Sequence, residues 1–321
     1  MLGLSSQSLL GVILSLQLRV RRFCASPGGV KSIITAYPSE GTGIDLLRDV
    51  LEEALRAARD VLTDVVERGV VGEPMGRGFY GDLSYRGDLA CEEAIIEVLR
   101  RRLGSVAVVS EELGVSYEGS DTPEYWALID PVDGSANMAR GIRFYSSGVA
   151  IARGPRVRDV VCTGVIDHGT GELFIREGEY SSHRNFHSPD RFPQDIKGRP
   201  TAFFHHVSFK RDDHIRETSV KIAERLRFFR VMGSALLEIC NASVGRVDAY
   251  LCLTPELRTM DIVPALYFAL GMGCRCASYP TPLLEERLDS KSRFSIIVSR
   301  NQSMFDEILS MVGASWGVIN W

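Results

Sequence analysis

The sequence predicts an α/β protein, an α+β layered sandwich of two lobes. Helical periodicity and short apolar strands alternate along most of the chain, which favours layers of helices and sheets. Two predicted strands, at 106–109 and 127–129, run into carboxylates, and ligands bind at that edge of layered α/β folds. The 321 residues are 45% hydrophobic and 24% charged, an ordinary globular composition that suffices for one large domain or two lobes.

Residues 1–43 do not share this pattern. Their apolar stretch, 9–18, is interrupted by Ser15 and Gln17 and is too short to span a bilayer. Three arginines follow this stretch, whereas a secretory signal carries its positive charges before the apolar run. We therefore predict that residues 1–43 are a disordered tail or an incorrectly assigned start, and we assign them no function.

The N-terminal lobe is predicted over residues 44–185 and begins with a helix. Apolar side chains from Ile44 to Val65 recur every three or four residues, which predicts a helix over 44–68. A glycine-rich stretch follows, and then a second helix over about 89–103 with Asp88 in the N-cap position. The remaining strands of this lobe are expected at 145–152 and, as a hairpin, at 160–166 and 172–176.

The C-terminal lobe is predicted over residues 186–321. The polar, proline-bearing segment 180–199 is interpreted as the link between the lobes. Beyond it, strands and helices alternate again. The strands are expected near 201–204, 228–231, 247–252 and 294–298, and the helices near 212–226, 234–244, 261–271 and 302–312.

One turn carries most of the chemistry in the sequence. An apolar run ends on Asp130-Pro-Val-Asp133-Gly134, and Ser135 then begins a predicted helical turn. Carboxylate oxygens suit hard divalent cations, and free N–H groups at a helix start suit phosphate. Such a turn could hold a metal ion and the phosphate that the ion polarises. The same residues are also ordinary turn formers, so the turn alone leaves a purely structural role open.

Three further carboxylates accompany the turn, namely Asp88, Glu111 and Asp261. Glu111 follows the strand at 106–109, and Asp261 opens an apolar helix of the second lobe. Each also has a structural alternative. Asp88 and Asp261 could be helix N-caps, and Glu111 could form a solvated pair with Glu112.

Composition limits the partners and the compartment. The net charge of −4 argues against a general nucleic-acid binder. The seven cysteines are an odd, scattered set, which indicates a reducing compartment without a disulfide framework. Cys274 and Cys276 lack a second ligand pair at zinc spacing and are predicted to be buried structure. We expect a cytoplasmic protein with no nucleic-acid partner and no membrane partner.

The order of the motifs resembles the inositol monophosphatase superfamily. The matching blocks are Ser110-Glu-Glu112, the stretch from Trp126 to Asn137, and a third block from Gly233 through Gly245-Arg-Val-Asp248-Ala-Tyr to Asp261. The resemblance covers about residues 44 to 312. It implies a sugar-phosphatase fold of two lobes with alternating helix and sheet layers. It also implies a Mg²⁺-dependent phosphomonoester hydrolase with a small phosphorylated substrate, which we expect to be a homodimer.

The resemblance implies two or three Mg²⁺ ions in each active site. Glu111, Asp130 and the backbone carbonyl of Val132 would hold one ion. Asp130, Asp133 and Asp261 would hold a second, and Asp88 would contribute to a third, weaker site. Paired metals of this kind clamp the attacking and leaving oxygens of a phosphoryl group.

The resemblance also implies the residues that handle phosphate and water. Gly134 and Ser135 would offer backbone N–H groups to the phosphate beside Asp133. Ser135, together with Glu111 and with Asp88 nearby, would orient the attacking water. Tyr85 stands where the family usually has threonine, so the surroundings of the third ion depart from the family pattern.

The segment from Glu256 to Asp261 is similar to the archaeal branch of the superfamily. Members of that branch often hydrolyse both fructose 1,6-bisphosphate and inositol 1-phosphate. Arg230 and Arg258 are candidates for binding the sugar or a second phosphate, because arginine suits bidentate phosphate contacts. A surface salt bridge is the alternative for both.

Two other functions remain open from the sequence. One is a 3′(2′),5′-bisphosphate nucleotidase of the same fold. The other is a non-catalytic binder of a phosphorylated ligand, which is disfavoured because clustered carboxylates without a cation repel one another.

Overall fold

The structure, a computed structural model, describes residues 45–184, 202–206, 213–226, 228–280, 282–313 and 315–321. These residues belong to one compact unit, Gly41–Trp321. The predicted tail at 1–43 and the predicted lobe boundary at 185/186 lie outside the described residues.

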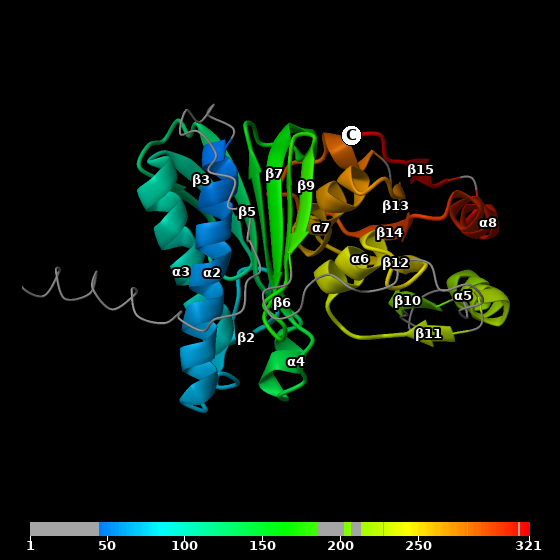
Figure 1. Cartoon of the computed structure of the whole chain (residues 1–321), viewed down its shortest axis with the longest axis horizontal. Helices are drawn as coiled ribbons and strands as arrows, with labels where there is room; N and C mark the ends of the chain where they lie inside the picture. Colours follow the sequence, from blue (N-terminus) through cyan, green and yellow to red (C-terminus); the bar gives the residue numbers. More distant parts are fainter. Residues whose placement is uncertain (1–44, 185–201, 207–212, 227, 281, 314) are drawn as a thin grey trace, which may run out of the picture. The chain divides into compact units, whose positions relative to one another are not determined.

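Helices and sheets alternate in layers, as predicted (Figure 1). Helices α2 (Asp45–Glu67) and α3 (Arg86–Leu103) cover one face of a seven-stranded sheet. Helices α6 (Ala235–Ser243) and α7 (Thr259–Gly271) pack between that sheet and a six-stranded sheet. Helices α5 (Asp213–Leu226) and α8 (Gln302–Val312) cover the outer face of the six-stranded sheet. The predicted α/β layered sandwich is therefore confirmed.

The seven-stranded sheet has the order β4-β3-β5-β6-β7-β8-β9. Strands β3 and β5 are parallel, and every other neighbouring pair is antiparallel. Because β3 and β5 run the same way, their carboxyl ends deliver Glu111 and Asp130 to one edge. The strands are β3 (Val106–Ser110), β4 (Gly114–Glu118), β5 (Tyr125–Asp133), β6 (Ser146–Ala152), β7 (Val160–Asp167), β8 (Leu173–Glu177) and β9 (Tyr180–Arg184).

The six-stranded sheet has the order β11-β10-β12-β14-β13-β15. Its strands are β10 (Ala202–His206), β11 (Phe228–Arg230), β12 (Ala249–Leu257), β13 (Arg275–Tyr279), β14 (Phe294–Ser299) and β15 (Gly317–Val318). Strand β12 leads directly into α7, whose first turn carries Asp261. This short connection places Asp261 at the start of α7, the helix that packs between the two sheets.

Helix α2 forms for the reason that its periodicity indicates. Its apolar stripe, including Leu51, Leu55 and Ala58, is fully buried against the seven-stranded sheet. Gly164 of β7 permits this approach, because a Cβ atom there would lie 2.1 Å from Cδ2 of Leu51. The pairing of α2 with the sheet thus depends on a missing side chain in the strand.

Several elements differ from the predictions. Segment 180–199, predicted as a link, begins with the edge strand β9. The residues of β9 are mostly polar and lack the alternation of apolar and polar side chains that predicts a strand. Strands β4, β13 and β15 and the small hairpin β1 (Pro74–Arg77) with β2 (Leu83–Tyr85) were not predicted. Helix α3 begins at Arg86, so the expectation that Asp88 is an N-cap was wrong.

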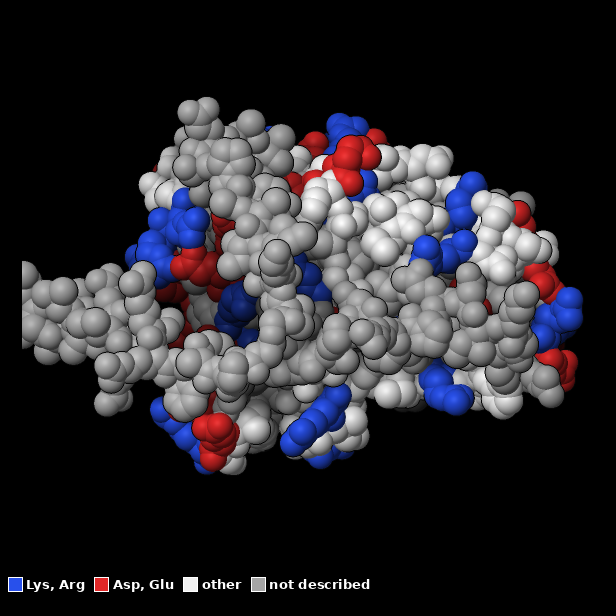
Figure 2. Space-filling model, in the orientation of Figure 1, with Lys and Arg blue, Asp and Glu red and all other residues white. Residues whose placement is uncertain are grey.

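Three further features concern the charged surface, the apolar character of the helices and two cysteines. On the face drawn in Figure 2, basic and acidic side chains of the described residues are interspersed. Among the described residues, no helix combines the length and apolar character needed to cross a membrane. Cys274 and Cys276 are buried free thiols, as expected.

Candidate active site

The predicted turn is built by a strand that ends in a bulge. Strand β5 continues to Asp133, and its pairing with β6 shifts register between Asp130 and Asp133. Gly134 then adopts φ 94° and precedes the short helix α4 (Ser135–Ala139). A Cβ atom at Gly134 would lie 3.1 Å from two backbone carbonyl oxygens, so only glycine suits the turn.

Asp133 points towards the start of α6. Its Oδ2 atom accepts hydrogen bonds from Oγ of Ser234 and from N of Leu236, both at 2.7 Å. Asn137 supports the same contact, because its Nδ2 atom donates to the carbonyls of Met232 (2.7 Å) and Phe144 (2.9 Å). The turn of the first sheet is therefore joined to the helix that covers the second.

Ser135 lies between Asp88 and the turn. Its Oγ atom is 2.6 Å from Oδ1 of Asp88 and 2.7 Å from the carbonyl oxygen of Val132. The other carboxylate oxygen of Asp88 accepts from N of Tyr85 at 2.7 Å, which closes the first turn of α3. Asp88 is thus both a structural residue of the helix and a neighbour of the predicted water-orienting hydroxyl. The structure brings together the serine and the aspartate that the sequence singled out.

Arg258 is bonded to the carboxylates of both Glu111 and Asp261. Its Nη2 atom lies 2.6 Å from Oε1 of Glu111 and 2.9 Å from Oδ1 of Asp261. Its Nη1 atom lies 3.0 Å from Oδ2 of Asp82. Arg258 is buried, with 7% of its surface exposed, so the alternative of a surface salt bridge was wrong for this residue. Asp261, the third residue of α7, accepts from N of Arg258 and is not an N-cap.

Burial and mutual repulsion dominate the electrostatics of this cluster. Burial raises the pKa of Asp130 well above its usual value, and the charges of Glu111 and Asp133 raise it further. Burial also raises the pKa of Glu111 to about 8, against the opposing effect of Arg258. For Asp133 burial raises the pKa to about 7, although the hydrogen bond from Ser234 opposes it. The cluster holds more acidic groups than one guanidinium neutralises.

The donor set fits hard divalent cations in its chemistry. Every group is a carboxylate or carbonyl oxygen, and Oδ1 of Asp130 is buried with no hydrogen-bond partner among the described residues. The arrangement itself is closed, because Asp133 is bonded to α6 and Asp261 to Arg258. No three His, Cys, Asp or Glu side chains of the described part stand in a geometry that could hold a metal ion. The guanidinium of Arg258 occupies oxygens of Glu111 and Asp261 that a cation would use.

Arg230 takes a different position from Arg258. It ends strand β11, is exposed, and donates from Nη1 to the carbonyl of the adjacent Phe229 at 3.0 Å. Among the described contacts, none joins Arg230 to the carboxylate cluster. Its predicted role in substrate binding stays a prediction.

Sequence reasoning missed several residues that shape the site. Ser234 and the buried Glu238 lie at the start of α6, where Glu238 accepts from N of Met232 at 2.6 Å and so shapes the loop facing the turn. Ser84 bonds Glu112 and ties the β1–β2 hairpin to the end of β3. Only Ser234 had a local signal, because it lies in the matched Gly233-Ser-Ala block.

Comparisons with known proteins give the family of the chain. The model of the inositol monophosphatase family matches residues 45–310. A fructose-1,6-bisphosphatase/inositol-1-monophosphatase of Methanothermobacter thermautotrophicus is 26% identical over 77% of this chain and 92% of its own length. A bifunctional NADP phosphatase/NAD kinase of Methanococcus maripaludis is 27% identical over 84% of this chain. The chain spans about half the length, 50%, of that bifunctional relative.

A solved structure with a similar fold carries a related description. A solved protein of Pyrococcus horikoshii, described as similar to inositol-1 monophosphatase, superposes with a TM-score of 0.66 at 19% identity. The match covers 84% of this chain and 100% of that one. The family match spans most of the chain and includes every carboxylate of the cluster. The chain therefore belongs to the inositol monophosphatase family, in its archaeal type, and is a phosphatase.

Proposed function

We propose that this protein is a Mg²⁺-dependent phosphomonoester hydrolase that acts on a small sugar or inositol phosphate. The observation that carries the proposal is the buried cluster of Glu111, Asp130, Asp133 and Asp261. Arg258 is bonded to two of these carboxylates, and Oδ1 of Asp130 has no hydrogen-bond partner among the described residues. A buried cluster of this composition is costly without added positive charge.

The proposed ligands follow the family motif. Glu111, Asp130 and the carbonyl of Val132 would hold one Mg²⁺, and Asp130, Asp133 and Asp261 a second. Asp88 would contribute to a third, weaker site. When bound, the ions would neutralise phosphate charge and make water a better nucleophile.

The chain's own residues would position the water molecule and the phosphate. Ser135 Oγ, held between Asp88 and the carbonyl of Val132, is placed to accept a hydrogen bond from a water molecule. Glu111, which follows β3 and is bonded to Arg258, is the proposed partner of Ser135 in orienting that water. The N–H groups of Gly134 and Ser135 begin α4 and are the proposed contacts of the phosphate.

Arg258 is proposed to exchange partners during binding. In the structure it neutralises Glu111 and Asp261. If bound Mg²⁺ supplied that positive charge instead, the guanidinium of Arg258 would be free to contact a substrate phosphate. Arg230, on the exposed edge strand, is the second proposed phosphate contact.

The names of two relatives supply the candidate substrates. Fructose 1,6-bisphosphate and inositol 1-phosphate are the first candidates, because the Methanothermobacter relative is described as hydrolysing both. A second candidate is a nucleotide phosphate such as NADP, because the bifunctional relative matches 84% of this chain. This second class includes 3′-phosphoadenosine 5′-phosphate. We further propose a cytoplasmic homodimer, which light scattering of the purified chain would check.

A substrate panel tests the proposal. Phosphate release is measured from fructose 1,6-bisphosphate, inositol 1-phosphate, NADP and 3′-phosphoadenosine 5′-phosphate, with Mg²⁺ and with EDTA. We expect release only with Mg²⁺ and fastest release from one of the first two substrates. Preference for the two nucleotides would replace the sugar and inositol phosphates with the second candidate class. Release that is unaffected by EDTA would exclude the metal-dependent reaction.

A further inference from the structure

The turn that carries the predicted metal ligands contains a β-bulge, and Pro131 lies in it. Because the register of β5 and β6 shifts between Asp130 and Asp133, Pro131 and Val132 both stand opposite Ser147. Such a bulge takes the extra residue out of the hydrogen-bond ladder. The buried carbonyl of Pro131 then needs a donor from elsewhere, since buried carbonyls rarely stay unpaired.

Ser147 is that donor, and His168 orients it. Oγ of Ser147 lies 2.5 Å from the carbonyl oxygen of Pro131 and 2.7 Å from Nε2 of His168. A carbonyl only accepts, so the single hydroxyl hydrogen of Ser147 goes to Pro131, and Nε2 of His168 must donate to Ser147. The thiol of Cys91, the other polar neighbour of Ser147, donates to the carbonyl of Ala58.

His168 is held in the form that this chain of bonds requires. Its ring stacks on Tyr145 with 5.8 Å between centroids. Its Nδ1 atom is buried without a partner among the described residues, as suits a nitrogen without hydrogen. Burial, helped by the charge of Arg59, lowers the pKa of His168 to about 3. The imidazole therefore stays neutral, with its one hydrogen on Nε2, throughout the neutral range.

We propose that His168 and Ser147 are positioning residues for the Asp130–Asp133 turn, acting through the carbonyl of Pro131. The carbonyl lies between the two aspartates in sequence, so holding it holds the backbone from which both carboxylates extend. Residues that hold metal ligands in place commonly change metal affinity by tenfold or more when removed. The inference rests on the proposed function only for the Mg²⁺ that the turn would hold.

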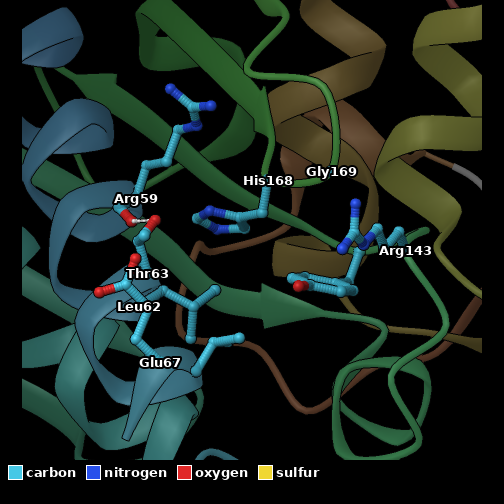
Figure 3. Close-up of a pocket in the computed structure, with 9 residues that line it drawn as sticks. Arg59, Leu62, Thr63, Glu67, Arg143, His168 and Gly169 are labelled. Carbon is cyan, nitrogen blue, oxygen red and sulfur yellow. Dashed lines mark hydrogen bonds between the residues drawn. The ribbon is translucent and has the colours of Figure 1, made fainter.

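The structure offers a way to remove and replace the imidazole. His168 lines a cavity of about 250 Å³ between α2 and the β7–β8 turn, beside Thr63, Arg143 and Tyr145 (Figure 3). Once the ring is cut back to glycine, a small molecule can enter its place from this cavity. The position is therefore open to chemical rescue.

The first experiment compares two buried serines in the full chain. Ser147→Ala removes the donor to Pro131. Ser295→Ala removes an equivalent bond in the other sheet, from Oγ of Ser295 to the carbonyl of Leu253 at 3.0 Å. We expect the Mg²⁺ dissociation constant, from Mg²⁺-dependent melting, to rise about tenfold in Ser147→Ala and to stay unchanged in Ser295→Ala. In the metal-free protein, the amides of residues 130–137 should exchange hydrogen faster only in Ser147→Ala.

The second experiment uses His168→Gly with added imidazole. The variant should lose Mg²⁺ affinity as Ser147→Ala does, and imidazole should restore it. 1-Methylimidazole has nearly the same shape but no N–H group when neutral, so it should restore little. Equal rescue by both molecules would show that the ring only fills space, and would overturn the proposal.

The outcomes separate the two proposals. A wild-type protein whose melting does not respond to Mg²⁺ would overturn the proposed function. The exchange rates of residues 130–137 would then still decide the positioning role, because they need no metal. Identical Mg²⁺ affinity and exchange in Ser147→Ala and Ser295→Ala would overturn the positioning role alone.

Discussion

Asp133 has two roles that a single substitution separates. Its carboxylate caps the start of α6, through Ser234 and Leu236, and it is a proposed metal ligand. Asparagine keeps the size and one oxygen acceptor, but removes the negative charge. The structural role therefore survives Asp133→Asn in large part, whereas the ligand role does not.

We expect Asp133→Asn to abolish phosphate release while the fold is kept. The metal-free melting temperature should be unchanged or slightly higher, because one of several like charges leaves the cluster. Saturating Mg²⁺ should raise the melting temperature less than in the wild type. Phosphate release and thermal melting with and without Mg²⁺ measure both effects. Turnover near the wild-type rate would contradict the ligand role of Asp133.

Arg258 is the residue on which the metal-free cluster depends. Arg258→Met leaves the buried Glu111 and Asp261 without their shared cation, so we expect the free energy of unfolding without metal to fall by about 3 kcal/mol. The Mg²⁺-induced stabilisation should grow, because the ion no longer competes with a guanidinium. Urea unfolding with and without Mg²⁺ checks both.

The control for Arg258 is an arginine in an exposed ion pair. Arg287 bonds Asp289 at 2.7 Å on the surface, and Arg287→Met should cost less than about 1 kcal/mol. Equal losses in the two variants would show that the buried contacts of Arg258 contribute no more than a surface pair.

At the scale of elements, the contact between α2 and β7 depends on a glycine in the strand. A Cβ atom on Gly164 would lie 2.1 Å from Cδ2 of Leu51 and 2.7 Å from Cδ1 of Leu55. Gly164→Ala should therefore lower the free energy of unfolding by about 1–3 kcal/mol through overpacking. Urea unfolding of the metal-free protein measures the loss.

A second variant identifies the clash that causes the loss. Leu51→Ala alone leaves a cavity and destabilises the protein. In the double variant with Gly164→Ala, the new methyl group has room, so the combined loss should be smaller than the sum. Strictly additive losses would argue that Gly164→Ala acts on the backbone of β7 and not on Leu51.

At the scale of the whole molecule, the buried carboxyl groups set the pH dependence of stability. Burial raises the pKa to about 7 for Asp88, Glu92, Asp133 and Glu238, and to about 8 for Glu111. In the unfolded chain the pKa of these groups is about 4. Between these values the folded state binds more protons than the unfolded state, so stability falls as pH rises.

We expect the metal-free melting temperature to fall from about pH 5 to about pH 8, because the folded protein holds protons that the unfolded chain has lost. Saturating Mg²⁺ should flatten this fall, since a bound cation stabilises the ionised carboxylates of Glu111 and Asp133. Melting curves across this range, with EDTA and with Mg²⁺, provide the measurement. A metal-free melting temperature that rises steadily over the same range would contradict the raised pKa values.

The sequence by itself determined the layered class, most helices and the residues of the turn. These follow from local causes: the three- and four-residue spacing in α2, the apolar runs of β3 and β5, and the need for glycine at position 134. The edge strand β9 was missed because its polar residues carry no such pattern. Likewise Asp88 and Asp261 were considered as N-caps, although each is the third residue of its helix. Sequence alone locates the start of a helix only to within a few residues.

Only the tertiary structure decided what each carboxylate contacts. Asp133 meets Ser234 across 101 residues of sequence, and Arg258 meets Glu111 across 147. No periodicity or local propensity reports such pairs, because they arise when the two sheets and their shared helices pack together. The support of Pro131 by Ser147 and His168 was equally invisible, since a β-bulge shows itself only in the register of two paired strands.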